Sequence, residues 1–226
     1  MGQHDHEGQH DHEGQHDHEG QHYHEGQRAL QDRFDTRRLA DRLAEVTADG
    51  VGEDQRDFIE SRDMFFLATA DADGVPQCSY KGGDPGFVRV LDRRTIAFPV
   101  YDGNGMFLSA GNLAVNPRVG TLFIALERGP RLRFNGVATI DDDDPLTATF
   151  PGAQLVVRVR GDAVFANCRR DVHRYEPVER SPFVPTGSVD PPVPDWKLDP
   201  WCSDVLPEHD PARDPGRPAG PSVPQF

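Results

Sequence analysis

Eight of the ten histidines lie in a repeat at the start of the chain, where their spacing suits metal binding. The unit Gly-Gln-His-Asp-His-Glu occurs three times from residue 2, and a fourth copy carries Tyr23 in place of the first acid. Imidazole is a preferred ligand of zinc, nickel and copper, and a nearby carboxylate can add a ligand or neutralise the ion. We therefore expect loose, exchangeable binding of a divalent transition metal such as Zn or Ni. The predicted ligands are His4, His6, His10, His12, His16, His18, His22 and His24.

Two alternatives to metal binding stay open for the repeat. It can be a solvated tail whose copies arose without a selected ligand, or a purification tag, although regularly spaced acids are not usual in such tags. In each case residues 1–27 lack the apolar side chains that offset the entropy lost when a chain becomes ordered. We therefore expect a disordered tail over residues 1–27 and a folded domain from residue 28.

The composition excludes several classes of protein. The net charge is −14, and residues 1–26, with seven acidic and no basic side chains, supply half of it. So acidic a chain has no electrostatic footprint for nucleic acid. The sequence has no apolar run of about 18 residues for a membrane span. Its first residues have neither a basic region nor an apolar stretch, so we do not expect them to be a secretory signal. Three widely spaced cysteines favour a reducing cytoplasm, and Cys78 is expected to be a buried packing residue.

Residues 28–175 predict a mainly β domain with a few flanking helices. Helical spacing of apolar residues predicts one helix from about 36 to 50 and another from about 54 to 62. Short apolar runs between turn residues predict the strands, with a short helix near 105–115. The expected strands are 64–70, 75–81, 87–91, 95–98, 119–126, 132–140 and 155–165. Their tight connections favour a six- to seven-stranded antiparallel barrel, since closure removes exposed sheet edges. The acidic run Asp141–Asp144 is expected to be a solvated turn.

Residues 176–226 form a Pro-rich segment that we call the C-terminal arm. It contains 13 of the 20 prolines and both tryptophans, Trp196 and Trp201. Aromatic side chains in such a segment make good interface anchors. We expect an extended arm that packs its aromatics onto the barrel or a partner subunit, with disorder after about residue 210.

Several motifs in the predicted barrel, taken in order, resemble one family. They are FLATADADG at 66–74, SYKGGDPGFVRVL at 79–91, AFP at 97–99, GNG at 103–105 and NPRVGTLF at 116–123. Their order and spacing over about residues 55–175 are similar to those of the pyridoxamine 5′-phosphate oxidase superfamily, the FMN-binding split barrels. The resemblance implies a split β-barrel and a homodimer with FMN in clefts between the subunits. It also implies an oxidoreductase that acts on a small molecule.

The resemblance also implies which residues hold the flavin. Lys81 would contact the phosphate or the ring, and Phe98 and Pro99 would approach the ring. Glycines that open a helix would present backbone N–H groups to the phosphate, and a helix N-terminus favours an anion on physical grounds alone. The full predicted cofactor set is Ser79, Tyr80, Lys81, Phe98, Pro99, Asn104, Gly105, Ser109 and Arg118, the last reaching the cofactor of the partner subunit.

The sequence departs from the oxidase itself at the phosphate site. Leu108 and Ser109 stand where the oxidase places an Arg-Lys pair, which argues against the vitamin B6 oxidase activity. No side chain has the setting of a general acid or base, and His173 is expected to be structural. Two alternatives to a flavin enzyme stay open: a non-catalytic barrel that holds haem, a deazaflavin or no cofactor, and a dimer that sequesters metal through its tail.

Overall fold

The computed structural model of this chain describes residues 23–47, 50–168 and 170–222. The chain divides into two compact units, one ending at Glu45 and one beginning at Val46. Seven of the eight predicted metal ligands, His4 to His22, lie outside the described residues, as does most of the tail for which disorder is expected. The predicted domain boundaries at residues 27 and 175 stay predictions.

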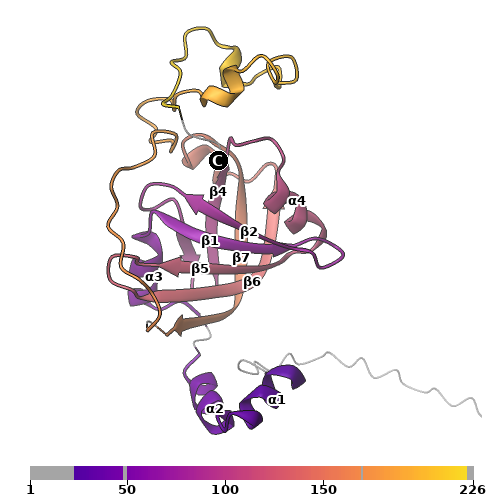
Figure 1. Ribbon diagram of the computed structural model, residues 1–226, viewed down its shortest axis with the longest axis vertical. Coiled ribbons are helices and arrows are strands. Elements are labelled where there is room, and N and C mark those ends of the chain that lie inside the picture. The colour runs from indigo at the N-terminus through magenta and orange to yellow at the C-terminus, as the bar shows by residue number, and fades with distance from the viewer. Residues whose placement is uncertain (1–22, 48–49, 169, 223–226) are drawn as a thin grey trace, which may run out of the picture. The chain divides into compact units, whose positions relative to one another are not determined.

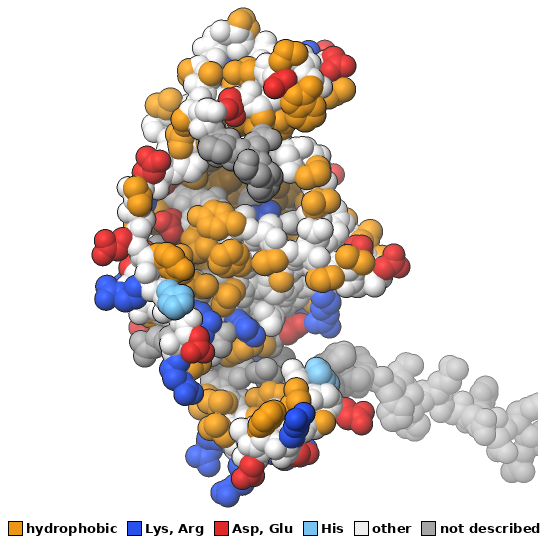
Figure 2. All heavy atoms as spheres, viewed as in Figure 1, with side chains coloured by type: hydrophobic (Ala, Val, Ile, Leu, Met, Phe, Trp, Pro, Cys, Tyr) orange, Lys and Arg blue, Asp and Glu red, His pale blue; other side chains and the backbone are white. Residues whose placement is uncertain are grey.

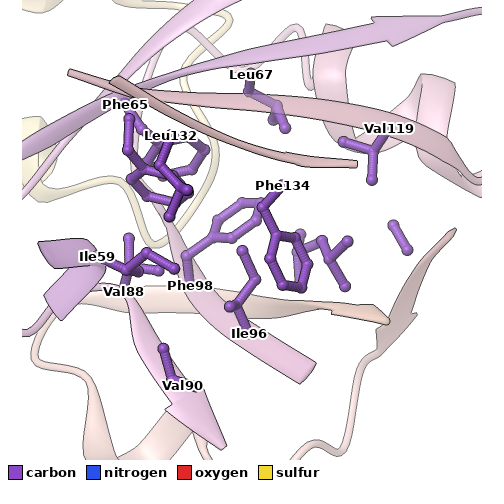
Figure 3. Packing of buried hydrophobic residues seen from close by; sticks show 14 of the residues in the cluster. Ile59, Phe65, Leu67, Val88, Val90, Ile96, Phe98, Val119, Leu132 and Phe134 are labelled. Atoms are coloured by element: carbon purple, nitrogen blue, oxygen red, sulfur yellow. The ribbon is translucent and has the colours of Figure 1, made fainter. Parts of the chain in front are cut away.

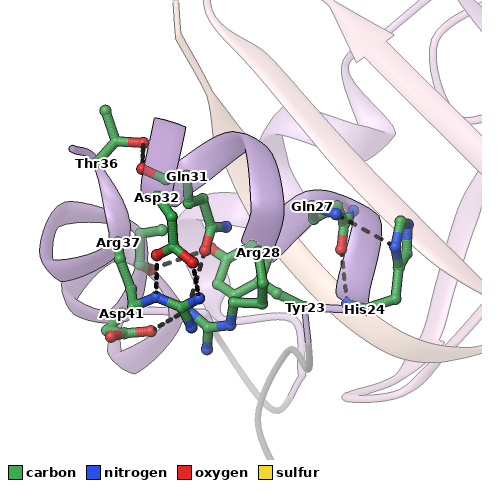
Figure 4. Close-up of polar contacts among 10 residues, drawn as sticks. Tyr23, His24, Gln27, Arg28, Gln31, Asp32, Thr36, Arg37 and Asp41 are labelled. Atoms are coloured by element: carbon green, nitrogen blue, oxygen red, sulfur yellow. Dashed lines mark hydrogen bonds and ion pairs between the residues drawn. The ribbon is translucent and has the colours of Figure 1, made fainter. Parts of the chain in front are cut away.

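The first unit contains two short helices joined by polar contacts. Helices α1 (Glu25–Arg33) and α2 (Arg37–Glu45) have no buried residue. Arg28 bridges them through Asp41 at 2.6 Å, and the Tyr23 hydroxyl donates to the carbonyl of Ala40 at 3.1 Å (Figure 4). His24 accepts a hydrogen bond from the Gln27 amide and so caps α1. The sequence predicts α2 but not α1, which begins inside the segment expected to be disordered.

The second unit is built on one antiparallel sheet of seven strands (Figure 1). Their order across the sheet is β2-β1-β5-β6-β7-β4-β3. The strands are β1 (Met64–Ala70), β2 (Pro76–Gly82), β3 (Arg89–Asp92), β4 (Thr95–Tyr101), β5 (Arg118–Ile124), β6 (Arg131–Asp141) and β7 (Ala153–Asn167). Helices α3 (Glu53–Glu60) and α4 (Leu108–Val115) flank the sheet. The predicted mainly β, seven-stranded antiparallel fold with a few helices is confirmed.

The sheet curls without closing, because its edge strands β2 and β3 do not pair with each other in the described part of the chain. The two longest strands, β6 and β7, pair with a register shift at Asn135/Gly136. A Cβ atom at Gly136 would lie 2.0 Å from the carbonyl oxygen of Arg160, so only glycine fits there. The result is a split barrel, as expected.

Phenylalanine and aliphatic side chains together fill the barrel (Figure 3). Phe65 of β1 is fully buried, and its ring centroid lies 5.0 Å from that of Phe98 and 5.1 Å from that of Phe123. Ile59 of α3 is also fully buried and belongs to the same cluster. Alternation along each strand sends these apolar side chains inward. The core therefore fixes strands β1, β4 and β5 against one another.

Three local expectations are wrong. Cys78 is exposed rather than buried, because it lies on edge strand β2. Asp144 is buried rather than solvated, because Arg158 of β7 donates two hydrogen bonds to its carboxylate, at 2.5 and 2.9 Å. That guanidinium lowers the pKa of Asp144. Helix α4 begins at Leu108 rather than near Gly105, because Phe107 before it adopts a left-handed backbone with φ of 48°.

The C-terminal arm runs beside the barrel as an extended segment and then folds into short turns (Figure 1). It contains the 3₁₀ helices η2 (Asp195–Leu198) and η3 (Pro211–Arg213). The described structure thus continues beyond residue 210, after which disorder is expected from the sequence. Within the described residues, no helix has the length and apolar character needed to cross a membrane.

Candidate functional site

A pocket of about 760 Å³ lies between the barrel and the arm. Strands β1, β2, β4 and β7, the loop that follows β4 and helix α4 supply one part of its lining, and arm residues 196–210 supply the rest. Apolar side chains gather on the arm and on the barrel surface below it (Figure 2). The volume falls within the range of about 300–1,000 Å³ typical of small-molecule and cofactor sites.

Lys81 of β2 supplies a positive charge to this pocket. Its side chain is half-buried, and burial lowers the pKa of its ammonium group. No carboxylate among the described residues forms an ion pair with it. A partly desolvated ammonium without a counter-charge favours an anionic ligand.

Two hydroxyl groups lie beside this charge in the lining. The Ser79 and Ser109 oxygens are 3.0 Å apart and share a hydrogen bond, which brings β2 against the first turn of α4. The first N–H groups of a helix have no partner within it, so this end of α4 offers donors as well. Asn104 and Gly105 line the pocket in the loop before α4, rather than in its first turn. The glycine turn expected to bind the phosphate is therefore a loop, in which the Met106 amide donates to Asn104 Oδ1 at 3.1 Å.

The inner wall of the pocket is apolar. Leu67, Phe98 and Val157 line it from three different strands, and each is 0–1% exposed. Such a wall excludes water and suits a flat aromatic ring system, whereas Lys81 and the two serines suit a phosphate. The residues present therefore fit a phosphorylated flavin, with separate polar and apolar parts of the pocket for its two ends.

The arm contributes a part of the pocket that sequence reasoning does not locate. Trp196, Lys197 and Trp201 line it, and Lys197 is only 3% exposed. The Lys197 ammonium lies 2.6 Å from Asp102 after β4 and 2.7 Å from Asp210 of the arm. One sequence feature could have identified Lys197: it and Lys81 are the only lysines in an arginine-rich chain, and both line this pocket.

Three predicted cofactor residues lie outside the lining of this pocket. Tyr80 follows Ser79 on β2 and packs against Phe66, with ring centroids 6.1 Å apart. Pro99 is buried on β4. Arg118 forms an exposed ion pair with Asp162 at 2.6 Å. The structure thus brings together Ser79, Lys81, Phe98, Asn104, Gly105 and Ser109.

No metal cluster is present in the described part of the chain, where no three His, Cys, Asp or Glu side chains group closely enough to hold an ion. His24, the one predicted metal ligand that is described, uses its Nδ1 atom to cap α1. His173 is exposed near the start of the arm and does not line the pocket.

Comparison with known proteins identifies a family over most of the second unit. The family model described as pyridoxamine 5′-phosphate oxidase matches residues 51–183. No curated protein matches the chain. The solved structure of HupZ from Group A Streptococcus is 19% identical, with a TM-score of 0.43, and the match covers 55% of this chain and 99% of HupZ.

Two further solved structures are similar at comparable levels. HutZ from Vibrio cholerae, described as a haem storage protein, is 22% identical with a TM-score of 0.37, over 48% of this chain and 88% of HutZ. A structure described as F420 reductase is 20% identical with a TM-score of 0.39, over 51% of this chain and 98% of that one.

Proposed function

Because the chain belongs to the pyridoxamine 5′-phosphate oxidase family, we propose that the pocket beneath the arm binds FMN and that the protein is an oxidoreductase acting on a small molecule. The observation that carries this proposal is Lys81, a half-buried ammonium in the pocket lining without an ion-pair partner among the described residues. Bound flavin would supply the hydride or electron transfer.

The residues of the chain bind and orient the cofactor. Lys81 would neutralise the phosphate. Of the two hydroxyl protons of Ser79 and Ser109, one is used in their mutual hydrogen bond, and the other would be donated to the phosphate. The buried wall around Phe98 takes the ring and keeps water from it. Among the ionisable side chains of the lining, Lys197 forms ion pairs with both Asp102 and Asp210, and Lys81 is the proposed phosphate ligand. The proposed protein chemistry is therefore binding, orientation and exclusion of water.

An absorption spectrum of the purified protein after incubation with FMN and removal of free ligand tests this function. We expect flavin absorption bands at about 370 and 450 nm that remain with the protein. A sharp Soret band from the protein as purified would instead favour the non-catalytic haem-binding alternative. A protein that retains no FMN would end the proposal.

We also propose a homodimer, in which a second copy covers edge strand β2. Gln77, Cys78 and Tyr80 on this strand are exposed, and an uncovered sheet edge is open to association. Light scattering should give about 50 kDa, twice the 25.1 kDa of the chain. The variant Tyr80→Glu should shift this mass toward 25.1 kDa, because it places a charge on the covered strand. A monomeric wild-type protein would contradict the proposal.

The repeat tail supports a second candidate function, capture of zinc or nickel. Deleting residues 2–22 removes seven repeat histidines but keeps the contacts of Tyr23 and His24 with the first unit. Calorimetric titration should show that the deleted protein has lost most of the bound metal while its affinity for FMN is unchanged. If the deletion leaves the number of bound ions the same, the tail is not the metal site.

A further inference from the structure

The last part of the C-terminal arm, residues 190–222, is a small folded module with its own internal contacts. Val193 and Ala219 form a β-bridge, and the Gly220 amide donates to the carbonyl of Val193 at 2.7 Å. Arg217 pairs with Asp190 at 2.7 Å. Because these contacts join the two ends of the module, its turns can act as one body rather than as a loose chain.

Lys197 connects this module to the barrel. One partner, Asp210, belongs to the module and is 8% exposed. The Lys197–Asp210 ion pair is therefore internal to the arm. The other partner, Asp102, follows β4, and 42% of the Asp102 side chain is exposed. A buried ammonium requires counter-charges. Of its two carboxylates, only Asp102 belongs to the barrel, so the Lys197–Asp102 ion pair fastens one body to the other.

Residues 190–222, held to the barrel by this ion pair, contribute two tryptophan side chains to the pocket lining. Trp196 immediately precedes Lys197, and its main-chain carbonyl accepts a hydrogen bond from the buried thiol of Cys202 at 2.9 Å. Trp201 also lines the pocket although it is 69% exposed, so most of its ring surface is available for contact with a ligand. Indole rings bind planar aromatic molecules well.

We propose that the arm is the second wall of the pocket, that Lys197 is a positioning residue that fixes this wall through Asp102, and that Trp196 and Trp201 retain a planar aromatic ligand against the barrel. The ligand part of this inference rests on the proposed binding of FMN. The attachment of the arm does not.

The attachment is tested without ligand through tryptophan fluorescence, because both tryptophans lie in the arm. In a Trp201→Phe background the emission comes from half-buried Trp196 alone. Asp102→Ala removes the barrel side of the ion pair and leaves Asp210 in place. Quenching of Trp196 by acrylamide should then rise about twofold. The matched control Asp162→Ala removes an exposed ion pair with Arg118 on the barrel, away from the pocket lining and from the module, and should leave quenching unchanged.

The ligand part is tested by the rate at which FMN leaves the protein with both tryptophans present. Asp102→Ala should release FMN about tenfold faster than wild type, because loss of a contact wall acts mainly on dissociation. Unchanged quenching in Asp102→Ala, with unchanged circular dichroism, would overturn the attachment. Increased quenching with an unchanged release rate would overturn the retaining role. Increased quenching in a protein that binds no FMN at all would confirm the attachment and reject the proposed cofactor.

Discussion

Replacing Lys81 with alanine should raise the Kd for FMN by about 5- to 150-fold, which corresponds to about 1–3 kcal/mol for a lost charged hydrogen bond. The reason is that Lys81 lines the pocket without a carboxylate partner among the described residues, so its charge is available to the phosphate. Titration of each variant with FMN, followed by the change in tryptophan fluorescence, measures the effect.

Riboflavin, which lacks the phosphate, is the matched ligand for this experiment. Its Kd should be nearly the same for wild type and Lys81→Ala, and Lys81→Arg should recover much of the FMN affinity. Burial lowers the pKa of Lys81 below its ordinary value of 10.5. The preference for FMN over riboflavin should therefore decline as the pH rises through this lowered pKa, since the ammonium loses its charge there. If Lys81→Ala lowered the affinity for FMN and for riboflavin equally, a contact between Lys81 and the phosphate would be contradicted.

Replacing Phe65 with alanine should destabilise the second unit by about 3–5 kcal/mol, the cost of emptying a large buried aromatic site. Phe65 is fully buried, and its ring packs against those of Phe98 and Phe123. Phe98 also lines the pocket, so FMN binding should weaken as well. Urea denaturation followed by circular dichroism measures the free energy of unfolding.

The matched control for that variant is Val178→Ala. Val178 is 97% exposed at the start of the arm, so its truncation should change the free energy of unfolding by no more than about 0.5 kcal/mol. Equal effects of Phe65→Ala and Val178→Ala would mean that the phenylalanine cluster is not the core of the barrel.

The strands can be predicted because their order and type depend on local patterns. A short apolar run followed by turn residues such as Gly74 marks β1 and the returning strand β2, and the predicted bounds of β1 agree with the observed ones. Sequence patterns miss helix α1 because it is polar and none of its residues is buried. They misplace the start of α4 because the left-handed conformation of Phe107 is rare for a bulky residue and has no sequence pattern.

The barrel part of the site can be predicted, but the arm part cannot. Ser79 and Lys81 belong to one motif that is continuous in sequence, Ser109 lies just after the GNG motif, and the structure brings all three to one pocket. Lys197 meets Asp102 across 95 residues, a contact that no local spacing indicates. The expected burial of Cys78 fails for a related reason: alternation along an edge strand does not tell whether its outer face is covered.

The most direct test of the proposed cofactor site is a crystal structure of the full-length protein grown with FMN. We predict density for the flavin in the pocket between the barrel and the arm, with its phosphate beside Lys81 and Ser109. A structure in which protein side chains fill this pocket, or in which FMN binds elsewhere and leaves Lys81 without a ligand, would contradict the proposed site.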